Sequence, residues 1–434
     1  MEEAEDEPLF RERVAGIDIG KQVIMVTVPI TSDTRKGGRQ QETREFGTTR
    51  RQLLALADWL RVWGVERAGM ESTSDYWKPV YFLLEREGFD CVLYQASQVK
   101  ALPGRPKTDK LDSAWLAKLT ERGSLAGSFV PPEGIRRLRT HTRYRRRLVQ
   151  ARTAEKQRVE KLLEDAHLKL SSVISDIHGV SGRDMLNAVI AGERDPRALA
   201  EMARGRMRRK TAALEEALDC TFLTPEHVFI LQMMLENIDQ LTAQVAVLDK
   251  RIAVLCEPYE HQVAQLDGIP GLGVTTAQDL IAEIGVDMSA FPTAGHLCSW
   301  ARLTPRVTES AGKRKGKNAT GRGNPYIGAA LGEAAAGAAR TRTFLAAKYQ
   351  RLCRHMPKGK AQVAIMRTQL TAAHALLSDP AAAYTDLGLG YYEQRADARR
   401  LASGHVRGLE RLGWRVTLEP VDPATGELIT RTAS

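Results

Sequence analysis

The sequence has little of what marks a secreted, zinc-binding or membrane protein. It holds five cysteines in 434 residues, an odd number, and none of them forms the Cys-x-x-Cys spacing of a zinc site. No stretch approaches about 18 uninterrupted apolar residues, and the chain begins Met-Glu-Glu-Ala-Glu-Asp-Glu, which is acidic where a secretory signal is basic. These absences predict a soluble cytoplasmic protein with reduced cysteines and no membrane partner.

An excess of positive charge is the clearest feature that is present. Lysine and arginine number 63 against 53 acidic residues, a formal net charge of +10. Three basic runs lie at residues 136–161, 204–210 and 313–322. One run alone is explained equally well by a solvated helix face or loop, but three runs favour nucleic-acid phosphates as partners and association with the nucleoid. The predicted nucleic-acid-binding side chains are Arg136, Arg137, Arg143, Arg146, Arg147, Arg208, Arg209, Lys313, Arg314, Lys315, Lys317 and Arg322.

Residues 12–130 alternate between short β-branched segments and segments with helical spacing, which predicts an α/β layer domain. The acidic residues 1–11 before it are expected to be disordered, and Pro131-Pro132 ends it. Two segments joined by a tight turn predict a β-hairpin. The expected strands are 14–20, 23–28, 65–70 and 91–94, and the expected helices are 50–62 and 76–85.

Residues 131–257 are rich in strong helix formers and predict an all-helical domain. Apolar residues in its second half follow alternating spacings of three and four, which is typical of a coiled coil. This seam either pairs with the basic helix of residues 136–166 as an antiparallel hairpin or pairs between chains, and we expect a homo-oligomer, a dimer or tetramer. The seam residues are Leu231, Met234, Ile238, Leu241, Val245, Leu248, Ile252 and Leu255.

The remainder divides into a third domain, residues 258–380, and an appendage, residues 381–434, whose role the sequence leaves open. Gly271 and Gly273 lie between two helical patterns. Glycines at a turn before a helix leave backbone N–H groups available for a phosphate, as in helix-hairpin-helix DNA binders. The alternative is a turn between packed helices.

Four carboxylates form the main candidate site. Asp18 lies in the first strand between Ile17 and Ile19, and alternation turns it to the opposite face from them. Glu71 ends an apolar strand, and Asp109 and Asp112 share one face at the start of a helix. Clustered carboxylates are tolerated when Mg²⁺ or Mn²⁺ neutralises them, and two such ions about 4 Å apart clamp a phosphodiester. Taken singly, Asp18 is better explained as a turn or cap residue and Asp109 as a helix N-cap, whereas the whole set favours a metal site.

Five motifs give these residues a wider context: Gly16-Ile-Asp-Ile-Gly20, Met70-Glu-Ser-Thr-Ser-Asp-Tyr-Trp-Lys-Pro-Val80, Pro103-Gly-Arg-Pro-Lys-Thr-Asp109 with Asp112, Ile269-Pro-Gly-Leu-Gly273, and Glu309-Ser-Ala-Gly-Lys-Arg314 followed by Gly323-Asn-Pro325. Through them nearly the whole chain resembles the insertion-sequence transposases with a RuvC-like DEDD domain, relatives of the Piv and MooV invertases that include the bridge-RNA-guided recombinases. Relatives often carry an extra basic residue within the third motif, but here the spacing of the acids is intact.

The resemblance implies a fold and a chemistry. It implies an α/β RuvC-like (RNase H-like) N-terminal domain, a central helical coiled coil, and a mostly helical C-terminal domain with a helix-hairpin-helix-like element. It makes Asp18, Glu71, Asp109 and Asp112 the metal-binding tetrad and Ser310 the nucleophile, and it implies donor DNA, target DNA and a bridge RNA as partners.

Two other functions compete with strand cutting and rejoining. A metal-dependent RuvC-like nuclease or junction resolvase would hydrolyse DNA without using Ser310. A non-catalytic nucleic-acid scaffold would explain the basic runs and the seam, but not the four acids. The Gly- and Lys-rich loop around Ser310 could let a hydroxyl attack phosphorus, but the loop alone favours a serine that only hydrogen-bonds a phosphate, and it is the resemblance that implies the nucleophile.

Overall fold

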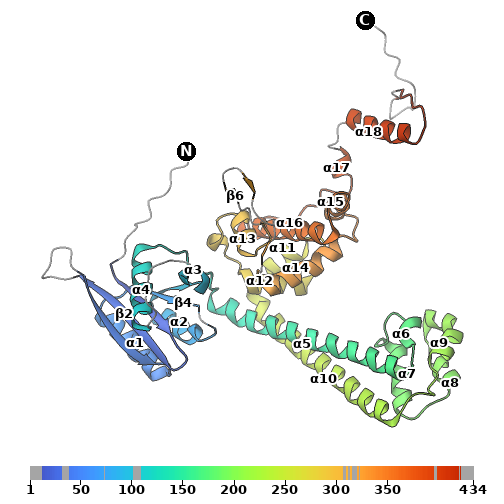
Figure 1. Cartoon of the computed structure of the whole chain (residues 1–434), viewed down its shortest axis with the longest axis horizontal. Helices are drawn as coiled ribbons and strands as arrows, with labels where there is room; N and C mark the ends of the chain where they lie inside the picture. The colour runs from blue at the N-terminus through green and yellow to red at the C-terminus, as the bar shows by residue number, and fades with distance from the viewer. Residues whose placement is uncertain are drawn as a thin grey trace, which may run out of the picture. The chain divides into compact units, whose positions relative to one another are not determined.

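The chain divides into two compact units, Met1–Val130 and Pro131–Ser434. The structure is a computed structural model (Figure 1) and describes residues 12–31, 39–72, 74–100, 109–305, 309–310, 313–314, 320–321, 323–394, 398–419 and 421. None of the helices in these ranges has the length and apolar character needed to cross a membrane.

The first unit is built on a five-stranded mixed sheet with the order β3-β2-β1-β4-β5. β2 pairs antiparallel with both β1 and β3, and β1, β4 and β5 are parallel. The hairpin expected at the start of the chain is confirmed, because Gly16 of β1 lies opposite Thr27 of β2. The strands are β1 (Val14–Ile19), β2 (Val23–Thr31), β3 (Arg39–Gly47), β4 (Arg67–Glu71) and β5 (Asp90–Tyr94).

One face of this sheet carries the apolar core. Alternate strand residues such as Ile17, Ile24 and Met70 are fully buried there. They pack against the apolar sides of α1 (Arg50–Val62) and α2 (Trp77–Arg86). This is the pattern expected of strands and helices that share a core, and it confirms the α/β character of the unit.

The other face of the sheet is covered by α4 (Asp109–Arg122), which packs on β1, β2 and β4. Two glycines allow this close approach. A Cβ added at Gly16 would lie 2.0 Å from the backbone nitrogen of Ala117, and one at Gly69 would lie 1.9 Å from Oγ1 of Thr120. The short helix α3 (Ala96–Lys100) precedes α4.

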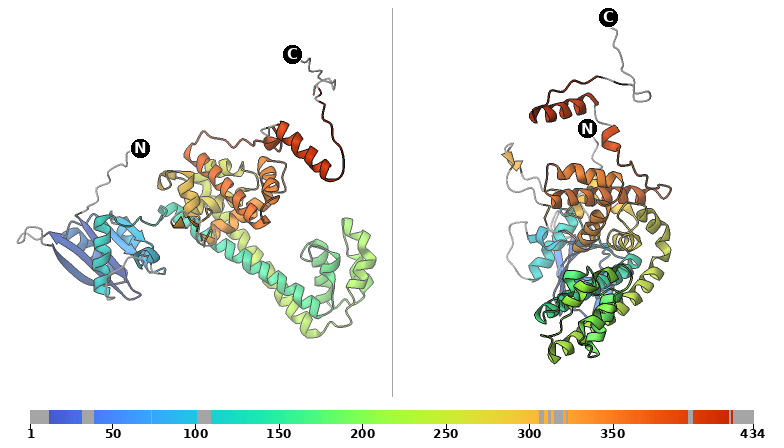
Figure 2. Two further views of the ribbon diagram at one scale, coloured as in Figure 1. Left: turned by 45° about the horizontal axis from the view of Figure 1, so that its top comes forward. Right: turned by 90° about the vertical axis from the view of Figure 1, so that its right-hand side faces the viewer.

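The second unit is helical, and its first part is a pair of long helices. α5 (Glu133–Asp165) and α10 (Pro225–Cys256) lie side by side (Figures 1 and 2). They run antiparallel, because Arg145 contacts Asp249 while Asp165 contacts His227. Along α10, Leu231, Ile238, Val245 and Ile252 are buried, and the intervening seam residues Met234, Leu241, Leu248 and Leu255 are half-buried. The seam therefore pairs with the basic helix of the same chain.

Five short helices connect the far ends of α5 and α10 and enclose a separate apolar core with them (Figure 2). Buried side chains of this core include Leu168, Met185 and Leu199. The connecting helices are α6 (Leu170–Val173), α7 (Val180–Ile190), α8 (Pro196–Glu201), η1 (Gly205–Lys210) and α9 (Thr211–Ala217).

The rest of the second unit is a helical bundle that α12 joins to α5. Pro258 follows the end of α10, as expected of a helix-breaking residue. Between α13 and α14 lies the two-stranded sheet formed by β6 (Glu309–Ser310) and β7 (Lys313–Arg314). The helices are η2 (Glu257–Tyr259), α11 (Glu260–Asp267), α12 (Val274–Ile284), η3 (Met288–Ala290), α13 (Ala294–Trp300), α14 (Pro325–Ala338), α15 (Phe344–Cys353), α16 (Lys358–Ser378), α17 (Tyr391–Gln394) and α18 (Ala398–Arg411).

Candidate active site and nucleic-acid interface

Asp18 and Glu71 are brought together by strand register. Ile17 of β1 lies opposite Met70 of β4, so that the next pair along these two parallel strands is Asp18 and Glu71. Ile17 and Met70 point into the apolar core, and strand alternation therefore directs the two carboxylates to the face covered by α4. Both are half-buried. Two carboxylates thus stand at the carboxyl ends of neighbouring parallel strands, where α/β sheets bind ligands.

Helix α4 brings Asp112 to the same face of the sheet. Ser113, the next residue, shares a 2.7 Å hydrogen bond with the hydroxyl of Thr27 on β2. Thr27 also shares one of 2.9 Å with Thr43 on β3. This chain of buried hydroxyls and the glycine contacts of the same helix fix where α4 crosses the sheet. Asp112 is half-buried at that crossing.

Asp109 is the first residue of α4, but its side chain lies outside the described residues. Within the described part of the chain, no group of three or more His, Cys, Asp or Glu side chains is arranged to hold a metal ion. Carboxylate oxygens are the donors that Mg²⁺ and Mn²⁺ prefer, so the chemistry of the donor set fits such an ion. The four-residue metal site remains a prediction.

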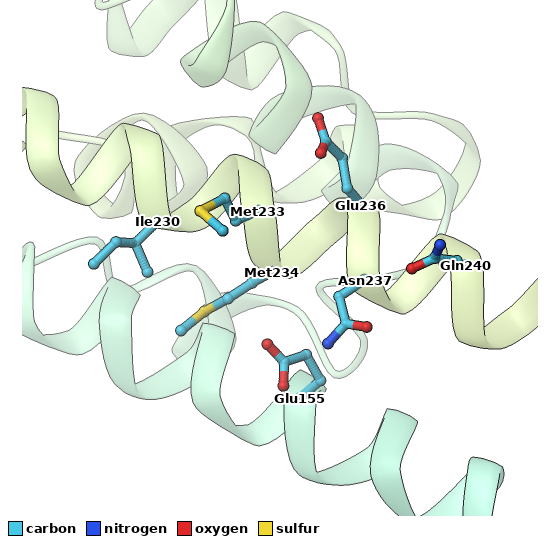
Figure 3. A pocket seen from close by; sticks show the side chains of 7 residues that line it. All are labelled: Glu155, Ile230, Met233, Met234, Glu236, Asn237 and Gln240. Atoms are coloured by element: carbon cyan, nitrogen blue, oxygen red, sulfur yellow. The ribbon is translucent and has the colours of Figure 1, made fainter.

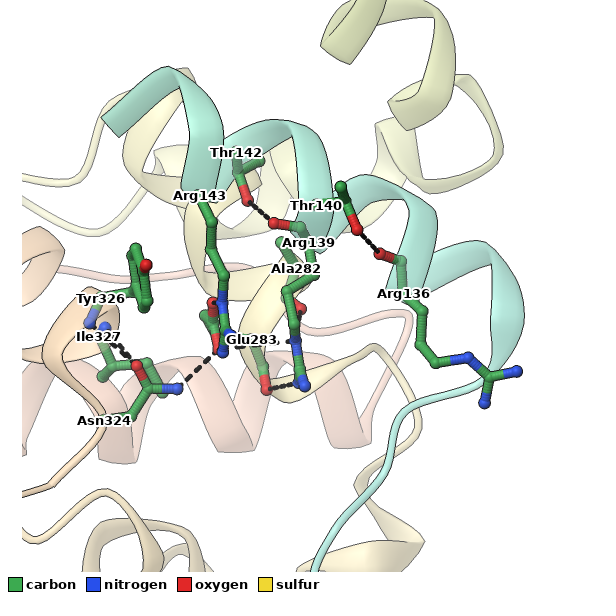
Figure 4. Close-up of polar contacts among 10 residues, drawn as sticks. All are labelled: Arg136, Arg139, Thr140, Thr142, Arg143, Ala282, Glu283, Asn324, Tyr326 and Ile327. Atoms are coloured by element: carbon green, nitrogen blue, oxygen red, sulfur yellow. Dashed lines mark hydrogen bonds and ion pairs between the residues drawn. The ribbon is translucent and has the colours of Figure 1, made fainter. Parts of the chain in front are cut away.

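The second unit contains a buried carboxylate that the sequence did not single out. Glu283, near the end of α12, is 1% exposed. It accepts two hydrogen bonds from Arg143 of α5, at 2.7 and 2.8 Å, and one of 2.6 Å from the side-chain amide of Asn324 (Figure 4). Arg143 also lies over the ring of Tyr326, 4.5 Å from its centroid. One carboxylate therefore joins α5, α12 and the start of α14.

Arg139 binds the end of α12 beside this carboxylate. It donates to the carbonyl oxygens of Ala282 and Glu283, at 2.8 and 2.7 Å (Figure 4). The last carbonyls of a helix lack partners within it and carry partial negative charge, which a guanidinium satisfies. Burial lowers the pKa of Arg139 to about 10, although the Glu283 carboxylate opposes this shift, so Arg139 remains charged at neutral pH.

Three further pairings neutralise other arginines of α5. Arg145, 5% exposed, binds Asp249 at 3.1 Å and Asp279 at 2.7 Å, and Arg146 binds Glu333 at 2.6 Å. Burial raises the pKa of Asp279, and Arg145 opposes that effect. Carboxylates from distant segments therefore supply counter-charge to arginines of this helix within the chain, and the predicted phosphate contacts of Arg143 and Arg146 remain a prediction. For Arg143 and Arg146 the structure shows ion pairs within the chain.

Other predicted phosphate contacts lie on exposed surface. Arg147 is exposed, and Arg137, whose side chain is 66% exposed, pairs with Glu133 one turn away. Arg208 and Arg209 are exposed on η1, whereas Arg136 is half-buried and donates to the carbonyl of Pro131. Exposed ion pairs are weak, so these side chains keep the capacity to bind phosphate.

The loop that carries Ser310 is described only in part. Ser310 lies opposite Lys313 in the β6–β7 pair, which brings a hydroxyl-bearing residue and a lysine to adjacent strands. The side chains of Ser310, Lys313 and Arg314 lie outside the described residues, as do Lys315, Lys317 and Arg322 altogether.

The two glycines of the predicted phosphate-binding turn differ. Gly271 has a φ of 87°, and a Cβ there would lie 2.1 Å from the carbonyl oxygen of Ala334. Its small size therefore serves contact with α14, which is the packing explanation. Gly273 precedes α12, and a Cβ added there would meet no atom within 4 Å. Only Gly273 retains space for a ligand, and the helix-hairpin-helix role remains a prediction.

A hollow of about 770 Å³ beside α5 and α10 does not suit nucleic acid (Figure 3). Its walls carry the carboxylates of Glu155 and Glu236 and the apolar side chains of Ile230, Met233 and Met234. Asn237 and Gln240 complete the lining, which contains no lysine or arginine. A phosphate would meet two carboxylates here, of which Glu155 already pairs with Arg158.

Comparison with known proteins agrees with this architecture. A family model for DEDD transposases of the IS110 type, described as a transposase, matches residues 15–168, and one described as transposase IS116/IS110/IS902 family matches residues 263–350. A stretch of 88 residues is 35% identical to the "Insertion element IS110 uncharacterized 43.6 kDa protein" of Streptomyces coelicolor, covering 20% of this chain and 21% of that protein. The match thus spans about a fifth of that relative's length.

The order of the domains defines the class: an α/β DEDD domain precedes a helical transposase domain. The chain belongs to the IS110-type transposases.

Sequence reasoning missed Glu283, and it included Asn324 in the motif Gly323-Asn-Pro325 without assigning it a role. Each carried a signal: Glu283 is an acid in the otherwise apolar segment Leu280-Ile-Ala-Glu-Ile284, and Asn324 directly precedes a proline, the pattern of a helix start. Neither signal names the partner, because the two residues are 41 positions apart.

Proposed function

We propose that this protein is a DNA recombinase that cuts and rejoins strands through a serine-linked intermediate, with a bridge RNA selecting donor and target DNA. The membership in a transposase family and the placement of Asp18 beside Glu71 support the proposal. The single observation that carries the metal-binding part is the register of β1 and β4, which puts two carboxylates on adjacent strand ends facing α4.

In this mechanism the Ser310 hydroxyl attacks a DNA phosphorus. A bond forms between Ser310 Oγ and phosphorus, the bond to the leaving strand's oxygen breaks, and that oxygen leaves as a hydroxyl once it is protonated. The seryl phosphodiester retains the bond energy, so rejoining by a second strand's hydroxyl needs no ATP. Asp18, Glu71, Asp109 and Asp112 would hold Mg²⁺ or Mn²⁺, which supplies positive charge to the phosphodiester. Lys313, opposite Ser310, supports the charge that develops on phosphorus.

The alternative is a RuvC-like metal-dependent nuclease or resolvase, in which water attacks and Ser310 is dispensable. The same pair of strand-end carboxylates supports it. The two functions differ in whether protein becomes linked to DNA.

Trapping that link tests the proposal. The full chain with its copurified RNA is incubated with labelled donor and target DNA and then denatured. We expect a DNA adduct on the tryptic peptide that contains Ser310, and we expect Ser310→Ala to lose both the adduct and the joined product while it still binds DNA. Ser171→Ala, at an exposed serine of α6, is the matched control and should retain both. Joined product from Ser310→Ala would overturn the serine mechanism, and cleavage without an adduct or joined product at any time would make the protein a nuclease.

A further inference from the structure

We propose that Glu283 and Asn324 are positioning residues that hold the base of the Ser310 loop, with Arg143 as the fixed counter-charge of Glu283. This inference rests on the proposed role of Ser310. The proposed positioning role does not require any of the three side chains to contact DNA. Their function would be to set where the loop leaves the helical bundle.

The two ends of the loop meet at the surface of the bundle. Its first part follows α13, where Arg302 adopts a positive φ of 57°. Its last part returns at Gly323, where an added Cβ would lie 2.4 Å from the carbonyl oxygen of Ala301. Entry and exit are therefore in backbone contact. In this proposal, a shift of the exit residue would displace Ser310.

Asn324 fixes the exit with both ends of its amide. Its Oδ1 accepts hydrogen bonds from the backbone N–H groups of Tyr326 and Ile327, at 2.9 and 3.3 Å, which caps α14. Its Nδ2 donates to Glu283 at 2.6 Å (Figure 4). Serine and aspartate cap helices as well as asparagine does, but neither an aspartate carboxylate nor a short serine hydroxyl reproduces this donor. Capping alone does not explain the asparagine.

Glu283 is held on its other side by charge. Arg143 occupies both carboxylate oxygens in a two-point contact, and its guanidinium lies over the ring of Tyr326, the second residue of α14. Bidentate contacts of this kind fix orientation as well as distance. The network therefore closes on itself: Arg143 to Glu283, Glu283 to Asn324, Asn324 to α14, and α14 back to Arg143.

Such a network is better suited to fixing the position of the attached segments than to stabilising the fold. A buried ion pair contributes little net stability compared with apolar side chains of the same volume, whereas its attested use is to specify one arrangement. Catalytic groups must be held within about 0.5 Å of their productive position, and an error of about 1 Å lowers rates by about a hundredfold. A clamp at the base of the loop meets this requirement for Ser310.

The test separates the cap of Asn324 from its link to Glu283. Asn324→Ser keeps a capping oxygen and removes the donor. Asn324→Asp also keeps the cap but sets two carboxylates against each other. The double variant Asn324→Asp with Glu283→Gln reverses the donor and acceptor between these two residues and leaves one negative charge in the cluster, but its amide nitrogen replaces the oxygen that also accepts from Nη2 of Arg143. Single-turnover rates of adduct formation on Ser310 and of strand joining are measured at saturating donor and target DNA, together with DNA affinity and thermal unfolding.

We expect Asn324→Ser to slow both rates by about ten- to a hundredfold with DNA affinity unchanged. Asn324→Asp should be slower still, and the double variant should recover part of that loss, because the link between residues 283 and 324 is restored while one contact with Arg143 is lost. A purely structural role would instead follow the unfolding temperatures and would not give this rescue. Wild-type rates in Asn324→Ser would overturn the inference, and so would a folded double variant no faster than Asn324→Asp.

Ser310→Ala distinguishes this inference from the proposed function. If Ser310→Ala still joins strands, the serine mechanism fails and the positioning role fails with it. If Ser310→Ala is inactive while Asn324→Ser reacts like the unaltered protein, only the positioning role fails.

Discussion

The two units use their carboxylates differently. In the helical unit, Glu283 is 1% exposed and is bound by a bidentate arginine and an amide, all from the same chain. In the α/β unit, Asp18 and Glu71 are half-buried at the ends of adjacent strands. A buried carboxylate with a resident cation serves structure, whereas paired carboxylates that remain accessible suit an ion from solution. Under the proposed function, the exposure of a carboxylate to solvent, more than its residue type, separates a structural role from a metal-binding one.

The arginines of α5 divide in the same way. Arg139, Arg143 and Arg145 face the bundle and bind carbonyls or carboxylates of α10 and α12. Arg137 and Arg147 lie on exposed surface of the same helix. A single basic run therefore holds both structural residues and candidate phosphate contacts.

The largest effect should come from the accessible carboxylates. Asp18→Asn or Glu71→Gln preserves shape and removes a negative ligand, and strand cleavage should fall by about a thousandfold or more, as when one member of a catalytic set is lost. The unfolding temperature should stay nearly unchanged. Asp90→Asn, at an exposed acid on the neighbouring strand β5, is the control and should cleave normally. Undiminished cleavage in either variant, or in EDTA, would remove that residue or the metal from the mechanism.

The opposite pattern is expected for the buried carboxylate. Glu283→Ala leaves the charge of Arg143 half-buried without its counter-charge, and breaking such a pair lowers the free energy of unfolding by about 3–5 kcal/mol. Urea unfolding measures this change. Glu333→Ala, which removes the 71% exposed partner of Arg146, should change stability by less than about 1 kcal/mol. Equal effects of the two substitutions would contradict the distinction between buried and exposed pairs.

A smaller effect should follow from crowding the contact of α4 with the sheet. Gly16→Ala places a methyl group 2.0 Å from the Ala117 nitrogen, so α4 must move, at a cost of about 1–3 kcal/mol. Because α4 carries Asp112, the Mg²⁺ concentration needed for cleavage should rise as well. Gly328→Ala in α14, where an added Cβ meets no atom within 4 Å, should leave both properties intact or raise stability slightly. A cleavage profile like that of the unaltered protein for Gly16→Ala would show that the position of α4 does not matter to the site.

Periodicity in the sequence predicted much of this architecture. Alternation around Ile17 and Ile19 identified the face of Asp18, and the spacing from Leu231 to Leu255 identified the side of α10 that packs on α5. β3 was missed because Arg-Gln-Gln-Glu-Thr-Arg-Glu-Phe-Gly shows no apolar alternation, as suits a sheet edge.

Pairing between distant residues was beyond the sequence. Counting charges along α5 gave a local excess of positive charge. The acids that balance it are Asp249, Asp279 and Glu283, which lie at least 104 positions from their arginine partners and meet them only in the folded chain. The sequence likewise gave no reason for glycine at positions 16 and 69. The structure gives one, because α4 packs closely against Gly16 and Gly69.

The smallest expected effect distinguishes the exposed arginines of α5 from those that face the bundle. Each lost phosphate contact lowers the slope of log affinity against log salt by about one unit, so Arg137→Ala with Arg147→Ala should flatten it by up to about two units. The free energy of unfolding should change by less than about 1 kcal/mol, because both side chains are exposed and the single pair with Glu133 is a surface one. Arg143→Ala should do the reverse: it leaves Glu283 without its bidentate partner and destabilises the fold, while the salt slope measured well below the unfolding temperature stays the same.

Filter-binding titrations over a range of salt concentrations, paired with urea unfolding of the same preparations, give both quantities. If the exposed pair leaves the slope unchanged, those arginines are merely solvated. If Arg143→Ala flattens the slope without loss of stability, Arg143 leaves Glu283 to bind phosphate when DNA is present, and the division between the two faces does not hold in the complex.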